Sequence, residues 1–288
     1  MMGEDTRADA VLAALERANP VPDGQALEGP DSPRARALAT AITGEDVGEP
    51  GLGAPSAQLL HDHVRLEIRD RVAVVSFDDG KANVLSAEVL DALGETVQIC
   101  EADDEVGALL IVGRPNHFSA GLDRRIFLAS PGGAYPLLAR VARLATRIYA
   151  SKLPVVAACT GNAIAAGALL LLAADVRVAA RGDYKIGLNE TAIGLPLPGW
   201  ASALARERLA REHFQRATLL AHLYSPEEAM PAGFVDRVVD SGELLAAAAR
   251  EAEELAALDP EAYAATIRVT RGDAIARLET FIEADFSS

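Results

Sequence analysis

The sequence predicts an α/β fold with largely parallel strand pairing. Short apolar segments typical of buried strands alternate with longer segments whose apolar residues recur at helical spacing. Half of the 288 residues are hydrophobic, which is enough for the sizeable core that such a fold requires. Beyond Gly199 the pattern changes to one helix after another. We therefore expect a core of alternating strands and helices, followed by a helical C-terminal region.

The strands are predicted from short apolar runs. Apolar and polar residues alternate over 64–68, and a continuous run follows at Val72–Phe77 after an Arg-Asp-Arg turn. This pattern predicts a hairpin-like pair at which the folded part begins. Further apolar runs predict strands at Ala108–Val112, 155–158, 176–179 and 234–239.

The helices are predicted from apolar residues at spacings of three and four. Ser86 is placed to cap a helix that runs to Cys100. Tyr135–Tyr149 has one apolar face, and 167–174 is almost entirely apolar, as expected of a buried helix. After Gly199, helices are predicted at 200–209, 213–220, Pro226–Ala232, 243–258 and 260–281.

Composition divides the chain into three regions. Residues 1–60 are acidic, with a Gly- and Pro-rich stretch from 43 to 56, and we expect a flexible N-terminal extension. Residues 61–232 form the predicted core. Residues 233–288 form a predicted helical region for oligomerisation, with spare apolar positions at Leu278, Phe281 and Ile282.

The charge and hydropathy of the chain exclude several partners. A formal net charge of −15 argues against nucleic acid and against anionic membrane surfaces. The sequence has no run of 18 apolar residues, which membrane insertion would require, and the acidic N-terminus does not resemble a targeting segment. Two cysteines cannot build a disulfide framework. We therefore expect a cytoplasmic protein.

Three motifs occur in order along the predicted core. They are Lys81-Ala82-Asn83-Val84-Leu85-Ser86, Phe118-Ser119-Ala120-Gly121-Leu122-Asp123, and Gly161-Asn162-Ala163-Ile164-Ala165-Ala166-Gly167. At these separations they resemble the crotonase superfamily, also called the enoyl-CoA hydratase/isomerases, over about 64–239. The resemblance implies a crotonase-type ββα spiral core with a helical C-terminal assembly region. It also implies a homotrimer or homohexamer that acts on an acyl-CoA thioester.

The resemblance implies an oxyanion hole made by the backbone N–H groups of Ala120 and Ala166. Loss of an α-proton from a thioester places negative charge on its oxygen, and fixed donors stabilise that charge. The positive N-terminal end of the dipole of a helix starting near Gly167 would stabilise the same oxygen further. The family usually has glycine where Ala166 stands, so the hole is expected to be tighter here. Without the resemblance, these small residues would indicate only close helix–strand packing.

Two positions decide the reaction that the resemblance implies. Hydratases of this superfamily use two glutamates, but here the helix position is Leu169 and only the loop position, Glu190, is an acid. A single carboxylate suits proton transfer from C2 to C4, which converts a 3-enoyl-CoA into a 2-enoyl-CoA. The apolar neighbours of Glu190 predict a raised pKa. No metal or other cofactor is expected, because coenzyme A belongs to the substrate.

Two alternatives remain open at this stage. The first is an enoyl-CoA hydratase that activates water with Glu190 alone. The second is a non-catalytic acyl-CoA-binding or scaffold protein that docks a partner through residues 1–60. The departure from glycine at Ala166 keeps this second alternative open.

Further residues are candidates for substrate binding. Pro198 and Trp200 are expected in the wall of the acyl pocket, and Asp123 is expected to cap the helix after the first oxyanion loop. Lys81 and Arg124 are candidates for contact with the coenzyme A phosphates. The full set of expected substrate contacts is Asn83, Leu122, Asp123, Gly167, Leu169, Pro198, Trp200, Lys81 and Arg124.

Overall fold

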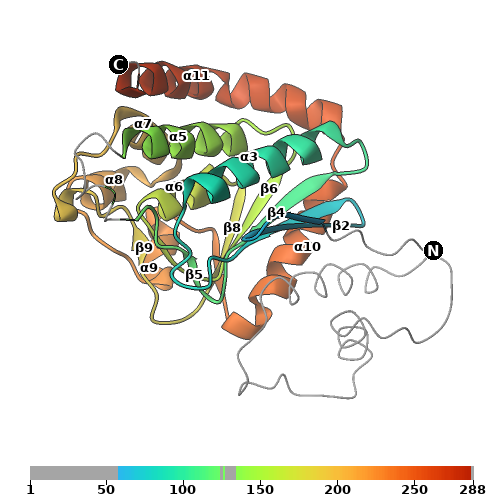
Figure 1. The fold of residues 1–288 in the computed structure, drawn as a ribbon, viewed down its shortest axis with the longest axis horizontal. Helices are drawn as coiled ribbons and strands as arrows, with labels where there is room; N and C mark the ends of the chain where they lie inside the picture. The colour runs from blue at the N-terminus through green and yellow to red at the C-terminus, as the bar shows by residue number, and fades with distance from the viewer. Residues whose placement is uncertain (1–57, 124–125, 127–133, 287–288) are drawn as a thin grey trace, which may run out of the picture.

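The computed structural model describes residues 58–123, 126 and 134–286. Within these residues the chain forms two β-sheets surrounded by helices, and the C-terminal helix lies across one end of the molecule (Figure 1). The predicted N-terminal extension lies outside the described residues, except for its last positions. Arg124 also lies outside them. No helix in the described part is long and apolar enough to cross a membrane.

The main sheet has seven strands in the order β1-β2-β3-β4-β6-β8-β10. The antiparallel strands are β1 (Gln58–His61), β2 (Val64–Arg69) and β3 (Val72–Phe77). The parallel strands that follow β3 are β4 (Ala108–Val112), β6 (Val155–Cys159), β8 (Val176–Ala180) and β10 (Arg237–Val239). The structured part thus begins before residue 64, where we expected it, because β1 pairs with β2. The strand near 234–239 is shorter than predicted.

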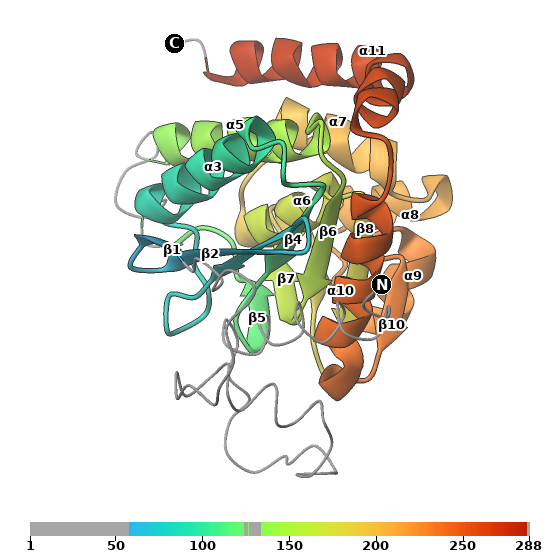
Figure 2. The ribbon, with the colours of Figure 1, turned by 90° about the vertical axis from the view of Figure 1, so that its right-hand side faces the viewer.

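Both faces of the main sheet are covered, so its parallel strands are apolar on both sides. On one face, residues such as Val74 and Leu110 pack against α10 (Leu244–Ala256). On the other face, alternate residues such as Val75 and Leu109 join the larger core beneath α3 (Ala87–Ala102) and α5 (Tyr135–Tyr149). Figure 2 shows α10 on one side of the sheet and α3 and α5 on the other.

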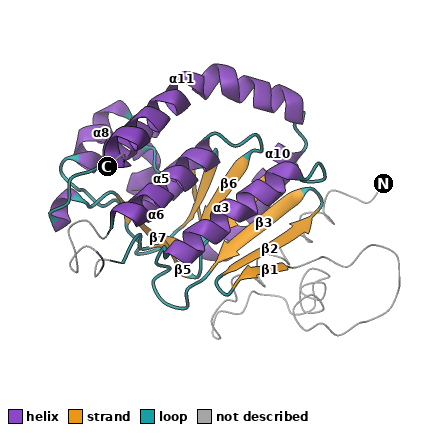
Figure 3. Ribbon diagram, turned by 45° about the horizontal axis from the view of Figure 1, so that its top comes forward, coloured by secondary structure: helices purple, strands orange, loops and turns teal. Residues whose placement is uncertain are grey.

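A second, smaller sheet was not predicted. It contains β5 (Asn116–Ser119), β7 (Gly161–Ile164) and β9 (Ile186–Gly187), all parallel. Successive main-sheet strands β4, β6 and β8 are each followed by one strand of this sheet. Figure 3 shows two of its strands, β5 and β7, side by side. The chain therefore winds as repeated strand–strand–helix units, as the predicted spiral requires. We expected loops here, because these strands are short and lack continuous apolar runs.

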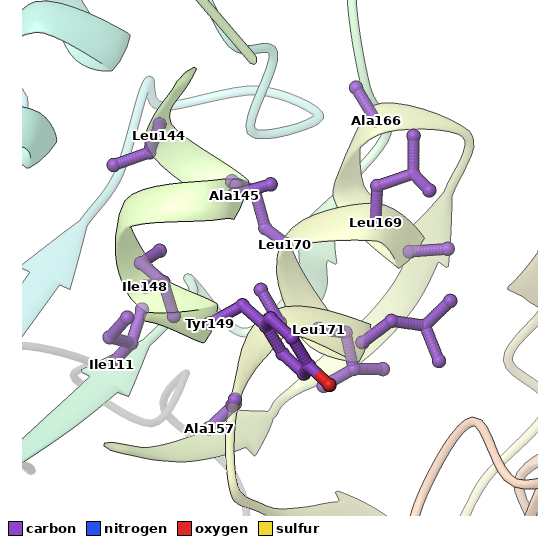
Figure 4. Packing of buried hydrophobic residues seen from close by; sticks show 14 of the residues in the cluster. Ile111, Leu144, Ala145, Ile148, Tyr149, Ala157, Ala166, Leu169, Leu170 and Leu171 are labelled. Atoms are coloured by element: carbon purple, nitrogen blue, oxygen red, sulfur yellow. The ribbon is translucent and has the colours of Figure 1, made fainter. Parts of the chain in front are cut away.

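The remaining helices pack around this framework. They are α6 (Ala166–Ala173), α7 (Gly199–Arg208), α8 (Arg211–Thr218), α9 (Pro226–Ala232) and α11 (Pro260–Phe286). The Ser86 side chain accepts the Val89 N–H at 3.3 Å, so the predicted cap of α3 is present. Every residue of α6 is buried, which explains why its sequence lacks a polar face. It packs against α5, with Ala145 and Leu170 between the two helices (Figure 4).

The long helix α11 is anchored to the core by a half-buried ionic cluster. The carboxylate of Asp175, which follows α6, accepts from Arg271 at 2.6 Å and from the Tyr263 hydroxyl at 3.0 Å. It also accepts the Val155 N–H at 2.7 Å. Since Arg271 and Tyr263 both belong to α11, this cluster fixes the helix on the core. The helix extends five residues beyond its predicted end and carries Asp285 and Phe286 back to the core.

Candidate active site

The strands of the small sheet bring three distant chain segments to one edge. Parallel pairing aligns Ser119 with Ala163 and Ile164 with Gly187. Because parallel strands end at the same edge, the residues that follow them leave the sheet side by side. These segments are 120–122, 165–166 and 188–190. The small sheet therefore places the motifs at 118–123 and 161–167 beside the loop that carries Glu190.

The first two segments approach each other closely, backbone against backbone. Gly121 has a φ of +82°, and a Cβ there would lie 3.3 Å from the Ala166 nitrogen. A Cβ on Gly167 would lie 2.8 Å from the Ser119 Cβ. Side chains at either glycine would fill space that the neighbouring segment occupies. The Gly121 loop is therefore packed directly against the first turn of α6.

Backbone N–H groups that have no acceptor among the residues that the structure describes include one from each of these two segments. These two N–H groups belong to Leu122 and to Ala166, the first residue of α6. The Ala166 N–H is one of the unpaired donors at a helix N-terminus, where the helix dipole is positive. The arrangement offers two donors to an oxygen bound at this point.

The structure corrects the prediction for Ala120. Its N–H donates to the Ala82 carbonyl oxygen at 3.1 Å, so it ties the loop to the preceding turn. Two residues further on, the N–H of Leu122 has no acceptor among the residues that the structure describes. The Ala166 N–H has no acceptor in the described part of the chain.

Ala165 holds a backbone conformation that favours glycine. Its φ of 51° and ψ of −118° are those of the first central residue of a type II′ turn. An alanine in such a region stores about 1–3 kcal/mol of strain. The Ala165 N–H donates to the Gly187 carbonyl oxygen at 2.9 Å, so pairing with β9 holds the strained turn in place.

A cavity of about 390 Å³ lies at this junction. Its lining is mainly apolar, with a few polar groups, as is typical of a small-molecule site. Seven of the residues singled out from the sequence line it, namely Ala120, Leu122, Ala166, Leu169, Glu190, Pro198 and Trp200. The structure thus brings together residues from four separate regions of the chain.

Glu190 supplies a partly buried carboxylate to the cavity. Its carbonyl oxygen accepts the N–H groups of Ile193 and Leu195, both at 3.0 Å, which fixes the loop. The Oε2 atom is buried and has no hydrogen-bond partner in the described part of the chain. Removal from water raises the pKa of Glu190 to about 7, against the opposing effect of nearby backbone N–H groups. A carboxyl group with this pKa can exchange protons at neutral pH.

Leu169 lies one turn after Ala166 on α6, so both residues face the same side of the helix. Its side chain is buried and lines the cavity. Figure 4 shows Leu169 next to Ala166 on the helix. A leucine can neither donate nor accept a proton. The α6 wall of the cavity therefore provides a helix N-terminus and apolar surface, but no acid.

Other predicted contacts lie outside the cavity lining. The buried Asn83 amide donates to the carbonyl oxygens of Phe77 and Phe118, at 3.0 and 2.8 Å, and so joins two segments of the core. Gly167 serves close packing, as described above. Lys81 is exposed, and the Asp123 carbonyl oxygen accepts the Ile126 N–H at 3.1 Å. These four residues are not among those that line the cavity.

Sequence reasoning missed the contribution of the chain's end. Asp285 and Phe286, at the end of α11, line the cavity beside Trp200. Tyr135, at the start of α5, also lines it. Nothing local marks Asp285 or Phe286, because their position depends on how α11 docks. In residues 58–123, 126 and 134–286, no cluster of three or more metal-binding side chains is present.

Comparison with known proteins gives consistent matches. The family described as enoyl-CoA hydratase/isomerase matches residues 67–287. Human mitochondrial enoyl-CoA delta isomerase 1 is 33% identical over 217 residues, covering 74% of this chain and 72% of the human protein. A probable enoyl-CoA hydratase of Bacillus subtilis is 34% identical over 150 residues, covering 51% of this chain and 56% of that protein. The apo structure of the Mtb enoyl-CoA isomerase superposes with a TM-score of 0.74 at 38% identity, covering 79% of this chain and 98% of that one.

Proposed function

The chain belongs to the enoyl-CoA hydratase/isomerase family, and we propose that it moves a double bond from the 3 to the 2 position of an enoyl-CoA thioester. One observation carries this proposal. The cavity presents the Glu190 carboxylate, whose buried Oε2 atom has no partner in the described part of the chain, whereas the α6 position that would supply a second acid is Leu169. One acid that takes and returns the same proton is sufficient for isomerisation.

In the proposed reaction, the ionised Glu190 removes a proton from C2 of the 3-enoyl thioester. The electron pair of that C–H bond delocalises over the C3–C4 double bond and the carbonyl group, giving a dienolate with its charge largely on the thioester oxygen. The protonated Glu190 then delivers the proton to C4. The double bond now lies between C2 and C3, and the carboxylate is regenerated, so atoms and electrons balance without a co-reactant.

The developing charge on the thioester oxygen is stabilised by the N–H groups of Leu122 and Ala166. Each such donor is worth roughly 10²–10³-fold in rate when it is fixed before the reaction. The support for this pair is their unpaired state and their place in or beside the cavity wall. The proposed chemistry requires no metal or redox cofactor, because the carboxylate moves the proton and the N–H groups stabilise the charge.

Hydration of a 2-enoyl-CoA is the second candidate. Its support is the similarity to the Bacillus subtilis protein and the presence of Asp285 in the cavity wall as a second carboxylate. Hydration requires activation of a water molecule together with protonation of the α-carbon. Asp285 accepts the Trp200 N–H at 3.1 Å, so this carboxylate already has a structural partner. Isomerisation is therefore favoured.

The test offers 3-hexenoyl-CoA and 2-hexenoyl-CoA separately to the purified protein and resolves the products by mass spectrometry. The proposal predicts conversion of the 3-enoyl thioester without change of mass, and little addition of water to the 2-enoyl thioester. Efficient gain of one water from the 2-enoyl thioester would instead establish the hydratase.

A further inference from the structure

The helix α7 begins without a side-chain cap of its own. Its N-cap position is Pro198, whose side chain has no oxygen. Instead, the Asp285 Oδ2 atom accepts the N–H of Trp200, in the first turn, at 3.1 Å. A carboxylate at this place satisfies a free N–H and meets the positive end of the helix dipole. The cap of α7 therefore comes from the last turn of α11, 85 residues along the chain.

A second contact joins the same two elements. A Cβ on Gly199 would lie 2.8 Å from the Phe281 ring and 3.4 Å from the Asp285 carboxylate. Phe281 and Asp285 are four residues apart, so they lie on one face of α11. Both side chains therefore dock on the first residues of α7, and the glycine there makes room for the aromatic ring.

This docking places Phe286 at a boundary between two hollows. Phe286 and Tyr135 line the 390 Å³ cavity that contains Glu190. They also line a larger groove, of about 780 Å³, that runs between α3 and α5. No other residue lines both hollows in the described part of the chain. The partition, by which we mean the pair of aromatic side chains Tyr135 and Phe286, lies where the cavity and the groove meet.

We infer that Asp285 is a positioning residue that limits the length of the acyl chain this protein accepts. By capping α7, Asp285 holds the end of α11 so that Phe286 closes the cavity against the groove. Short acyl chains fit within the closed cavity. Longer chains reach the partition and need the groove beyond it. This inference rests on the proposed function in one respect, that the ligand of the cavity is an acyl-CoA.

Binding of saturated acyl-CoAs tests the inference without requiring turnover. Trp200 is the only tryptophan in the chain and lines the cavity, so its fluorescence reports occupancy. Titrations with hexanoyl-, dodecanoyl- and hexadecanoyl-CoA give a ratio of dissociation constants for long and short chains. We expect Asp285→Ala to favour long chains. The dissociation constant for hexadecanoyl-CoA, divided by that for hexanoyl-CoA, should fall by about tenfold, within the range that loss of a helix cap produces.

Three further variants separate the cap from a general loss of structure. Asp285→Asn should keep the ratio within about twofold of the unaltered protein, because the amide oxygen can still accept the Trp200 N–H. Asp273→Ala, at an exposed acid on the same helix, should leave it unchanged. Phe286→Ala removes the partition without touching the cap and should shift the ratio as Asp285→Ala does.

The inference is overturned if Asp285→Ala and Phe286→Ala both keep the unaltered ratio, or if Asp285→Ala weakens binding of all chain lengths equally.

Assay of 3-hexenoyl-CoA on the same preparations distinguishes the role of Asp285 from the proposed isomerase activity. Shifted binding ratios without isomerisation would overturn the isomerase and leave the role of Asp285 standing. Isomerisation with unshifted ratios would support the isomerase and overturn the role of Asp285. Absence of acyl-CoA binding by the unaltered protein would overturn both.

Discussion

Ile164 and Gly187 are paired in parallel register at the edge of the small sheet. The N–H of Ala165 donates to the Gly187 carbonyl oxygen across this pairing. The residues that follow the two strands therefore emerge together, so that Ala166 and Glu190 line one cavity. A two-residue strand thus determines the distance between the proposed oxyanion donor and the proposed base.

Replacing the proposed base should remove turnover but not binding. We expect Glu190→Gln to lower kcat/KM for 3-hexenoyl-CoA by about 10²–10⁴-fold, the usual contribution of a general acid–base group. The affinity for hexanoyl-CoA, followed by Trp200 fluorescence, should change by less than about threefold. Asp104→Asn, at an exposed acid, serves as the control. Unaltered turnover in Glu190→Gln would exclude the mechanism, and a scaffold protein would show no turnover in any form.

The rate should depend on pH through a single ionisation near 7. Glu190 must be ionised to remove the C2 proton, and burial raises its pKa to about 7. We expect kcat/KM to fall about tenfold for each pH unit below that value and to reach a plateau above it. Stopped assays between pH 5 and 9 measure the profile. A profile that stays flat across this range would show that another group carries the proton.

The same pKa shift should make the unaltered protein less stable as pH rises. The carboxyl group of Glu190 titrates near 4.5 when unfolded and near 7 when folded, so the folded state binds more protons between these values. The free energy of unfolding therefore decreases as pH rises from about 4.5 to 7, by up to about 3 kcal/mol from this group. Comparing urea unfolding of the unaltered protein and Glu190→Gln at pH 5 and pH 8 isolates the effect. Equal pH dependence in the two proteins would contradict it.

An acid at position 169 should introduce hydration. Leu169 faces the cavity from α6, so Leu169→Glu would supply the second carboxylate that water addition requires. We expect mass gain of one water from 2-hexenoyl-CoA, together with a stability cost of about 2–4 kcal/mol for burying the new group. Leu169→Gln has nearly the same shape without the charge and should show no such gain. An unchanged product profile in Leu169→Glu would count against the isomerase interpretation of this site.

Relieving the strained turn before α6 should stabilise the protein. Ala165 has a φ of 51°, which glycine adopts without strain. We expect Ala165→Gly to raise the free energy of unfolding by about 1 kcal/mol, after the entropic cost of glycine is deducted from the strain released. Ala168→Gly, in the regular part of α6, should instead lower it by about 1 kcal/mol. Midpoints of urea unfolding measure both variants, and destabilisation of Ala165→Gly would show that the turn is not strained.

Local apolar periodicity was sufficient for much of the framework. The strands Val72–Phe77 and Ala108–Val112 and the helix Tyr135–Tyr149 have the predicted bounds. Each of these elements buries a continuous surface, so its apolar residues recur at the spacing typical of a strand or a helix. The raised pKa of Glu190 was also predictable, because burial causes it and because its apolar neighbours in the chain, Ile193 and Leu195, line the same cavity. The sequence by itself therefore determined the main sheet, most helices and the central acid.

The tertiary structure decided what depends on contacts between distant segments. The small sheet is built from strands too short to show an apolar pattern, so it forms only through pairing with one another. We propose Leu122 rather than Ala120 as the donor, because the Ala82 carbonyl oxygen already accepts the Ala120 N–H, whereas the Leu122 N–H has no acceptor among the described residues. Asp285 enters the cavity wall because α11 docks on α7. In each case a hydrogen bond or packing contact between residues distant in the sequence determines the role of a residue. Such a contact produces no periodic pattern in the sequence.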